Sequence, residues 1–166
     1  MLTLTATHTP TPTVLYIYSD AAAPQIFIPS GYMGDGDLEV IENWTVEPYS
    51  GTSAIRIVYD PQGRPLDDGH HRCQMGLPTT NVCGWTGLYW LYPADNQGIV
   101  PGYDLSASGC TRMTFWARSE TPLSIRFIVG GIGWGIPTQP AYPDSLRDPR
   151  STGWVQLSSE WTMYTN

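Results

Sequence analysis

Lysine is missing from this chain of 166 residues, and all eight basic residues are arginines. Charged residues make up 14% of the chain, against about 25% in typical soluble domains. The formal net charge is −7. Nucleic acids and anionic membranes bind basic faces, so this balance argues against both as partners. It suits a partner that is recognised without charge, such as a neutral polysaccharide or another copy of the same chain.

Long apolar runs are missing as well. No stretch of about 18 apolar residues is present, so we expect no membrane insertion. Residues 1–6, Met-Leu-Thr-Leu-Thr-Ala, lack the basic start and the long apolar stretch of a secretory signal. If the protein is exported, we expect that the signal has been removed or that Met1 is not the natural start.

No catalytic constellation stands out. Glycoside hydrolysis needs two carboxylates at a defined separation, and most of the 15 carboxylates fall in predicted turns or at strand ends with no motif to pair them. His70 and His71 are adjacent, so on a strand they face opposite sides, and no zinc-type spacing occurs elsewhere. We therefore predict a protein that is not an enzyme and binds no catalytic metal. Asp35-Gly36-Asp37 is a candidate for structural Ca²⁺, although an ordinary Asp-Gly turn is the commoner reason for such a sequence.

The sequence has only three cysteines. Cys73 and Cys83 bracket a turn-rich loop that a disulfide would close, and such a bridge adds about 3 kcal/mol in the chain-entropy picture. The alternative is a pair of unbridged thiols in a cytosolic protein. Cys110 is left over, and it is either buried as a small apolar residue or available to a second chain.

The first thirteen residues form a candidate extended arm. Threonine occupies every second position from Thr3 to Thr13, and Pro10 and Pro12 favour an extended, polyproline-like path. Composition alone favours a solvated or O-glycosylated linker. The sharper interpretation is a preformed strand that pairs with a sheet. A separate glycosylation candidate is Asn43, in the only N-x-S/T sequon of the chain.

Short β-rich segments follow one another along residues 14–166. Gly, Pro, Asn and Asp separate them, and no segment has a convincing 3.6-residue apolar period. The spacing predicts one all-β domain of the β-sandwich type. The predicted strands are Val14–Tyr18, Gln25–Ile28 (ended by Pro29), Asp37–Ile41, Ala54–Tyr59, Trp85–Leu91, Met113–Arg118, Ser124–Val129, Trp154–Ser158 and Trp161–Thr165.

Several motifs within residues 26–165 are familiar in combination. They are Gly84–Pro93, Asn96–Gly98, Gly102–Ser106, Thr114–Arg118, Pro29–Asp35, Val129–Ile132 and Tyr142–Ser145. Together they resemble secreted bacterial β-sandwich modules of the galactose-binding-like, carbohydrate-binding-module type, which often follow Thr/Pro linkers. The resemblance implies a jelly-roll sandwich in an extracellular or cell-surface setting. It implies no particular ligand, because such folds host many functions.

Members of that group continue beyond the segment that matches residues 160–165 into strands that close the sandwich, whereas this sequence stops at Asn166. We therefore expect an open groove with an unpaired strand edge, which is a template for another strand. The preferred hypothesis is a filament subunit that donates its arm to the next copy, head to tail. A sequence cut from a longer protein and return of the arm into its own groove are the alternatives. The donor residues would be Leu2, Leu4 and Ala6, and the acceptor edge would be Trp161, Met163 and Thr165.

The second functional hypothesis is a monomeric carbohydrate-binding module of a larger secreted protein. Sugar binding needs exposed aromatic rings, which stack on the C–H face of a pyranose, beside polar groups that bind its hydroxyls. On a strand Trp85 and Tyr89 share one face while Trp90 and Tyr92 share the other, so at most half of these rings are exposed. The candidates are Trp134, which would serve equally as an interface anchor, and Trp90, Tyr92 and Asn96.

Overall fold

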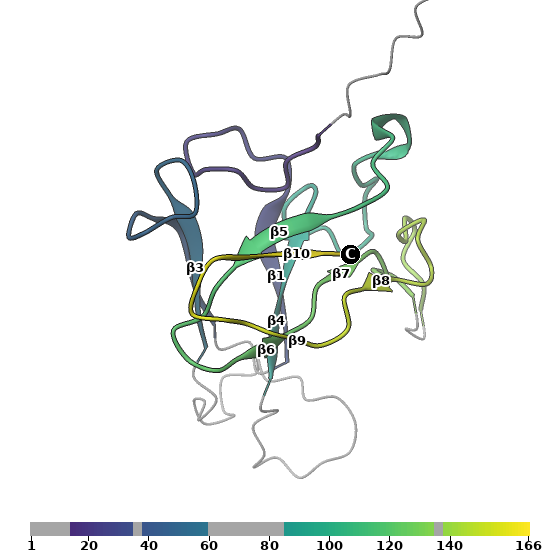
Figure 1. Ribbon diagram of the computed structural model, residues 1–166. Helices are drawn as coiled ribbons and strands as arrows, with labels where there is room; N and C mark the ends of the chain where they lie inside the picture. Colours follow the sequence, from purple (N-terminus) through teal and green to yellow (C-terminus); the bar gives the residue numbers. More distant parts are fainter. Residues whose placement is uncertain (1–13, 35–37, 60–84, 135–137) are drawn as a thin grey trace, which may run out of the picture.

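Among the residues that the structure describes, the regular structure consists of antiparallel strands and one short 3-10 turn at Ser106–Ser108. A computed structural model describes residues 14–34, 38–59, 85–134 and 138–166 (Figure 1). The prediction of an all-β fold is confirmed for these residues. The strands are β1 (Ile28–Gly34), β2 (Leu38–Trp44), β3 (Ala54–Tyr59), β4 (Thr86–Leu91), β5 (Thr114–Ala117), β6 (Ser124–Ile125), β7 (Ile128–Val129), β8 (Arg150–Ser151), β9 (Val155–Gln156) and β10 (Thr162–Thr165).

Some of the sequence predictions fall outside the described residues. They concern the arm at residues 1–13 with Leu2, Leu4 and Ala6, the turn Asp35-Gly36-Asp37, the pair His70-His71, and the loop between Cys73 and Cys83. These expectations stay predictions.

The first four strands pair in a nested order. β1 pairs with β4, from Ile28 opposite Leu91 to Gly34 opposite Thr86. β2 pairs with β3 between them in the sequence, and both pairs are antiparallel. The β1–β4 pair therefore joins segments more than 50 residues apart in the sequence, and it encloses the β2–β3 pair in chain order.

The last six strands belong to one long antiparallel path. β5 pairs with β10, β6 with β9, and β7 with β8. Backbone hydrogen bonds continue the pairing between these short ladders, from Ser119 N to Ser158 O (2.9 Å), from Leu157 N to Leu123 O (2.9 Å) and from Thr152 N to Phe127 O (3.1 Å). Residues 113–129 therefore run beside residues 150–166 along their whole length, as the green and yellow segments of Figure 1 show.

All five ladders among the described residues are two-stranded. Nested pairing is how the strands of a jelly roll are connected, but the ladders do not join into the two larger sheets that a jelly roll requires. The all-β class is therefore shown, and the jelly-roll order stays a prediction.

Three strand predictions differ from the structure, and one short strand was not predicted. Gln25–Ile28 is not a strand, because only its last residue, Ile28, belongs to β1. Val14–Tyr18 forms no strand, because its side chains rather than a ladder hold it: the Tyr18 hydroxyl donates to the main-chain oxygen of Glu42 (3.1 Å). Ser124–Val129 is split into β6 and β7. The two-residue strand Arg150–Ser151 was missed because its side chains show no β preference.

Pro29 lies inside β1, although we predicted that it would end a strand. The register shifts between Pro29 and Gly31, so Ser30 is an extra residue in the bulge. A bulge tolerates proline because its missing N–H is not needed by the ladder there. The Ser30 hydroxyl accepts a hydrogen bond from Asp95 N (2.9 Å), which ties the bulge to the loop after β4.

The buried apolar core is small. Leu91 at the end of β4 and Leu157 after β9 are the buried apolar side chains among the described residues, at 3% and 9% exposure. Half-buried aromatic rings extend this core, with Phe115 stacked on Phe127 and Tyr164. Many large apolar side chains remain exposed, which leaves apolar surface for contacts with other molecules.

Asp20 fastens the segment before β1 to the loop between β2 and β3. Its carboxylate accepts hydrogen bonds from Thr52 N (2.6 Å) and Ala22 N (3.1 Å) and from the Ser53 hydroxyl (3.1 Å). The two main-chain N–H groups hold the pKa of Asp20 far below its usual range. Gly51 lets the Asp20 carboxylate come close to the backbone of the loop. Its φ of +67° favours glycine, and an added Cβ would meet the carboxylate.

Replacing Asp20 with Asn is expected to lower the thermal midpoint at pH 7, because an amide nitrogen cannot accept the hydrogen bond from Thr52 N. A carboxyl with a depressed pKa stabilises the fold above its unfolded pKa of about 4, and that stability is lost as the pH falls below this value. The gap between wild type and Asp20→Asn should therefore be widest above pH 5 and shrink toward pH 2. Thermal melts followed by circular dichroism measure it, with the exposed Asp148→Asn as the control. A gap that is independent of pH would contradict the carboxylate's role.

Candidate functional site

The ladder of β5 and β10 has one face turned outward. Exposure alternates along both strands, so that Thr114 and Trp116 of β5 and Met163 and Thr165 of β10 are exposed while the residues between them are half-buried. Trp116 lies directly opposite Met163, and cross-strand partners share a face. The centre of this outward face is therefore apolar, with exposed fractions of 40% for Trp116 and 55% for Met163.

The loop between β2 and β3 adds a further ring to this face. Tyr49 stacks on Trp116, with the ring centroids 3.8 Å apart and the planes at 14°. The Tyr49 ring also lies 6.2 Å from that of Trp161, at a tilt of 59°. We call Tyr49, Trp116 and Trp161 the aromatic surface.

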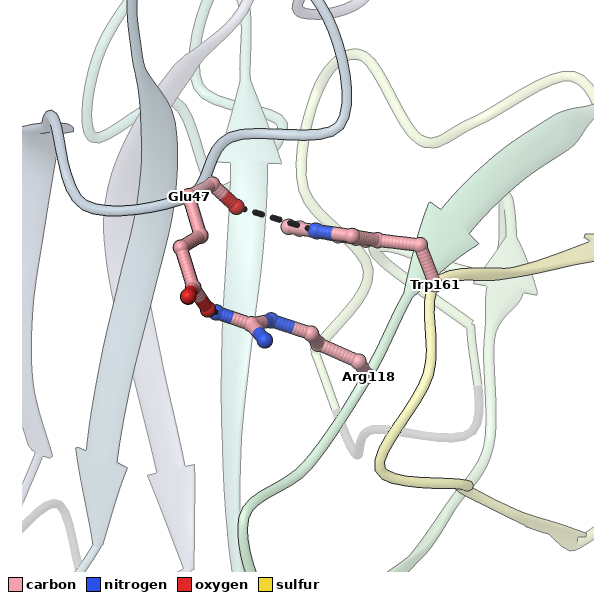
Figure 2. Close-up of polar contacts among 3 residues, drawn as sticks. All are labelled: Glu47, Arg118 and Trp161. Carbon is pink, nitrogen blue, oxygen red and sulfur yellow. Dashed lines mark hydrogen bonds and ion pairs between the residues drawn. The ribbon is translucent and has the colours of Figure 1, made fainter.

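Glu47 and Arg118 fix the position of Trp161 in the aromatic surface (Figure 2). The indole N–H of Trp161 donates to the main-chain oxygen of Glu47 (3.0 Å), whose carboxylate pairs with the Arg118 guanidinium (2.9 Å). The guanidinium lies 5.4 Å from the centroid of the Trp161 ring. Glu47 has a φ of +48°, which costs a residue other than glycine conformational energy. The contacts of Glu47 with Trp161 and Arg118 hold the β2–β3 loop against the ladder of β5 and β10, and they offset the conformational energy of Glu47.

Two residues of β10 direct their backbone groups away from β5. Met113 and Asn166 form a hydrogen-bonded pair, since the N–H of each donates to the C=O of the other (3.2 and 3.0 Å). From this pair onward, non-hydrogen-bonded and hydrogen-bonded pairs alternate along the ladder of β5 and β10. By that alternation Tyr164 and Thr162 bond to β5, while the N–H and C=O groups of Met163 and Thr165 point to the opposite edge. No other described residue pairs with this edge. Two of the three predicted acceptor residues thus lie on a strand edge that no described residue pairs with, which we call the open edge, and the third, Trp161, lies in the aromatic surface.

The two predicted sugar-binding tryptophans, Trp134 and Trp90, are both half-buried. The Trp134 indole donates to the main-chain oxygen of Asp144 (2.6 Å), and the Arg147 guanidinium lies 5.4 Å from its ring centroid. Trp90 is half-buried in β4, and its Nε1 atom is buried without a hydrogen bond from the described residues. One face of Trp134 is therefore covered, and little of Trp90 is open to a ligand.

Asn96 organises the loop after β4. Its Nδ2 group donates to the main-chain oxygens of Tyr92 and Val100, and its Oδ1 atom accepts from the N–H groups of Gly98, Ile99 and Val100, all at 3.0–3.2 Å. The residue is 9% exposed. A sugar would have to break these bonds to reach it.

Tyr92, the other predicted contact after β4, is 41% exposed. Its ring packs edge-on against Phe27 and Tyr103. This small aromatic cluster holds the Tyr92 ring in place and leaves part of it open to solvent.

Trp154 is the most exposed tryptophan of the described residues, at 68%, and was not among the predicted sugar contacts. The Arg126 guanidinium lies 5.3 Å from its ring centroid. Beside it the Ser124 hydroxyl donates to Gln156 Oε1 (2.9 Å), in the ladder of β6 and β9. No signal in the sequence separated Trp154 from Trp134, since both follow a glycine with positive φ, Gly153 and Gly133.

Asn43 and Cys110, two further residues of interest in the sequence, both lie in the described part of the chain. Asn43 lies in β2 and is exposed, as a glycosylated asparagine must be. Cys110 is exposed, so it is not buried as a small apolar residue.

The described residues hold no helix with the length and apolarity of a membrane span. They also hold no group of three His, Cys, Asp or Glu side chains placed to bind a metal ion. Comparison with family models, curated proteins and solved structures found no match for this chain. The resemblance to carbohydrate-binding-module-type domains stays a prediction.

Replacing Trp161 with Phe keeps a ring beside Tyr49 and removes the hydrogen bond to Glu47. We expect the free energy of unfolding to fall by about 1 kcal/mol, the usual net value of one hydrogen bond. Denaturant melts measure the change. Trp85→Phe is the matched control, because the indole of this exposed tryptophan makes no hydrogen bond to the described residues. Equal changes in the two variants would contradict the role of the indole N–H.

Proposed function

We propose that the protein is a non-catalytic structural subunit, outside the cell or at its surface, that assembles head to tail by β-strand addition at β10. The observation that carries this proposal is the edge of β10, where Met163 and Thr165 direct their backbone groups away from β5. Such an edge is the site at which an extended peptide adds to a sheet.

The arm of a neighbouring copy is the strand that we propose for this edge. Its residues Leu2, Leu4 and Ala6 lie at alternate positions, so on a strand they share one face. Donor and acceptor are different surfaces of the chain, so the contact is heterologous and repeats into a filament.

Backbone pairing alone is too weak to hold such a filament together. Met163 and Thr165 offer two N–H and two C=O groups, and at about 1 kcal/mol net per hydrogen bond they contribute about 4 kcal/mol, or a Kd of about 1 mM. Burial of a leucine side chain adds about 1.5–3 kcal/mol. Leu2 and Leu4 together with the exposed Met163 are therefore the side chains that would make assembly stable at micromolar concentration.

A proline at position 165 is expected to prevent assembly without unfolding the subunit. Thr165→Pro removes an N–H group that points away from β5 and places the ring at the edge where the added strand would lie. Electron microscopy of the full chain should show fibres for the wild type and separate particles for Thr165→Pro.

Thr114→Pro is the matched control for this experiment. Thr114 lies opposite Thr165, and its N–H points to the other edge of the ladder. This variant should form fibres like the wild type. Fibres formed by Thr165→Pro would show that β10 is not the acceptor edge.

A neutral polysaccharide is the second partner that we propose, as a carbohydrate-binding module would have. The observation that favours it is Trp154, whose ring is exposed and lies beside the guanidinium of Arg126 and the polar side chains of Ser124 and Gln156. A flat ring with hydrogen-bonding groups around it suits the C–H face and the hydroxyls of a pyranose.

Retention on an insoluble neutral polysaccharide distinguishes the candidate rings. Trp154→Ala is expected to lose about two- to tenfold in affinity, since stacking of one ring is worth about 0.5–1.5 kcal/mol. Trp134→Ala should lose less, because this ring is half-buried and its indole already donates to the main-chain oxygen of Asp144. A pull-down assay over a range of polysaccharide concentrations measures both. Equal retention of wild type and Trp154→Ala would remove this ring as a binding site.

A further inference from the structure

The aromatic surface lies at the N-terminal end of β10, where Trp161 directly precedes the strand. Tyr49, Trp116 and Trp161 present rings that the protein leaves partly exposed, with 46% for Tyr49 and 40% for Trp116. Arg118 has further guanidinium N–H groups beyond the one that bonds Glu47. Exposed aromatic rings with a few hydrogen-bond donors are the features that bind proline-rich, polyproline II peptides.

The chain itself contains such a peptide. Residues 9–13 read Thr-Pro-Thr-Pro-Thr, and their two prolines favour the polyproline II conformation, in which no backbone group is bonded internally. Proline rings pack flat on aromatic rings, and the free carbonyl groups accept hydrogen bonds from donors such as the Arg118 guanidinium. The segment lies three residues beyond Ala6, the last of the proposed donor residues.

The direction of the added strand decides whether this segment reaches the aromatic surface. A strand antiparallel to β10 runs from the Thr165 end to the Trp161 end, so the residues after Ala6 leave it beside Trp161. The four residues from Ala6 to Pro10 span about 12 Å when extended, and this is the length over which we expect the segment to reach the aromatic surface. A parallel strand would leave at the Asn166 end instead.

We propose that residues 9–13 of a neighbouring copy bind across the aromatic surface, and that the donated strand runs antiparallel to β10. This inference rests on the proposed function, and it names a second contact for the same assembly. The strand supplies backbone pairing, and the Thr/Pro segment supplies contacts between proline and aromatic rings. The rigidity of the segment also lowers the entropy that the arm loses on binding.

The test compares the concentration at which the full-length chain assembles, measured by sedimentation and electron microscopy. The variants are the pair Pro10→Ala/Pro12→Ala, the single change Trp116→Ala, and their combination, with Trp85→Ala as the control for an exposed tryptophan elsewhere. The proline pair and Trp116→Ala should each raise the assembly concentration about fivefold. The combination should raise it no further, because each change removes the same contact.

The proline variants change only the arm, so they test the contact even where Trp116→Ala weakens the fold through loss of the Tyr49 stack. Assembly at the wild-type concentration by the proline pair, or effects that multiply in the combination, would overturn the inference. If Thr165→Pro blocks assembly while these variants do not, strand addition stands and the Thr/Pro contact falls. If the wild type stays monomeric and the proline pair changes only its melting temperature, the arm binds its own copy and both proposals fail.

Discussion

The pairing of residues 113–129 with residues 150–166 is the constraint on which the other features of this protein depend. Its register puts Trp116 opposite Met163 and turns both outward, while Phe115 and Tyr164 face inward. A shift of one residue would reverse every one of these side chains. The same register determines which backbone groups of β10 bond to β5 and which point to the open edge.

Contacts between arginine guanidinium groups and tryptophan rings add to the stabilisation that the small apolar core provides. Four of the eight arginines lie over tryptophan rings, as the pairs Arg56/Trp44, Arg118/Trp161, Arg126/Trp154 and Arg147/Trp134. Each such contact is worth about 0.5–1 kcal/mol at an exposed site. A guanidinium stacks on a ring better than an ammonium does, which accounts physically for the use of arginine in a chain without lysine.

The proposals for assembly draw on two kinds of group in one ladder. Strand addition uses the backbone of Met163 and Thr165, and the Thr/Pro contact uses the rings of Tyr49, Trp116 and Trp161. The proposed polysaccharide site at Trp154 lies at the ladder of β6 and β9, further along the same antiparallel path. Different substitutions therefore test the β10 edge, the aromatic surface and Trp154. The pairing of residues 113–129 with residues 150–166 positions part of each.

The sequence by itself determined the all-β class and the position of most strands, because β-branched and aromatic residues between turn residues act locally; Ala54–Tyr59 was predicted to the residue. Only the tertiary structure decided which tryptophans are exposed and what each polar group bonds. The sequence made Asn96 a candidate ligand residue, but its side-chain amide is bonded to the backbone of its own loop. Trp161 donates a hydrogen bond to Glu47, which lies 114 positions earlier in the chain. Contacts between distant segments depend on how the ladders pack, and no local pattern of residues encodes that packing.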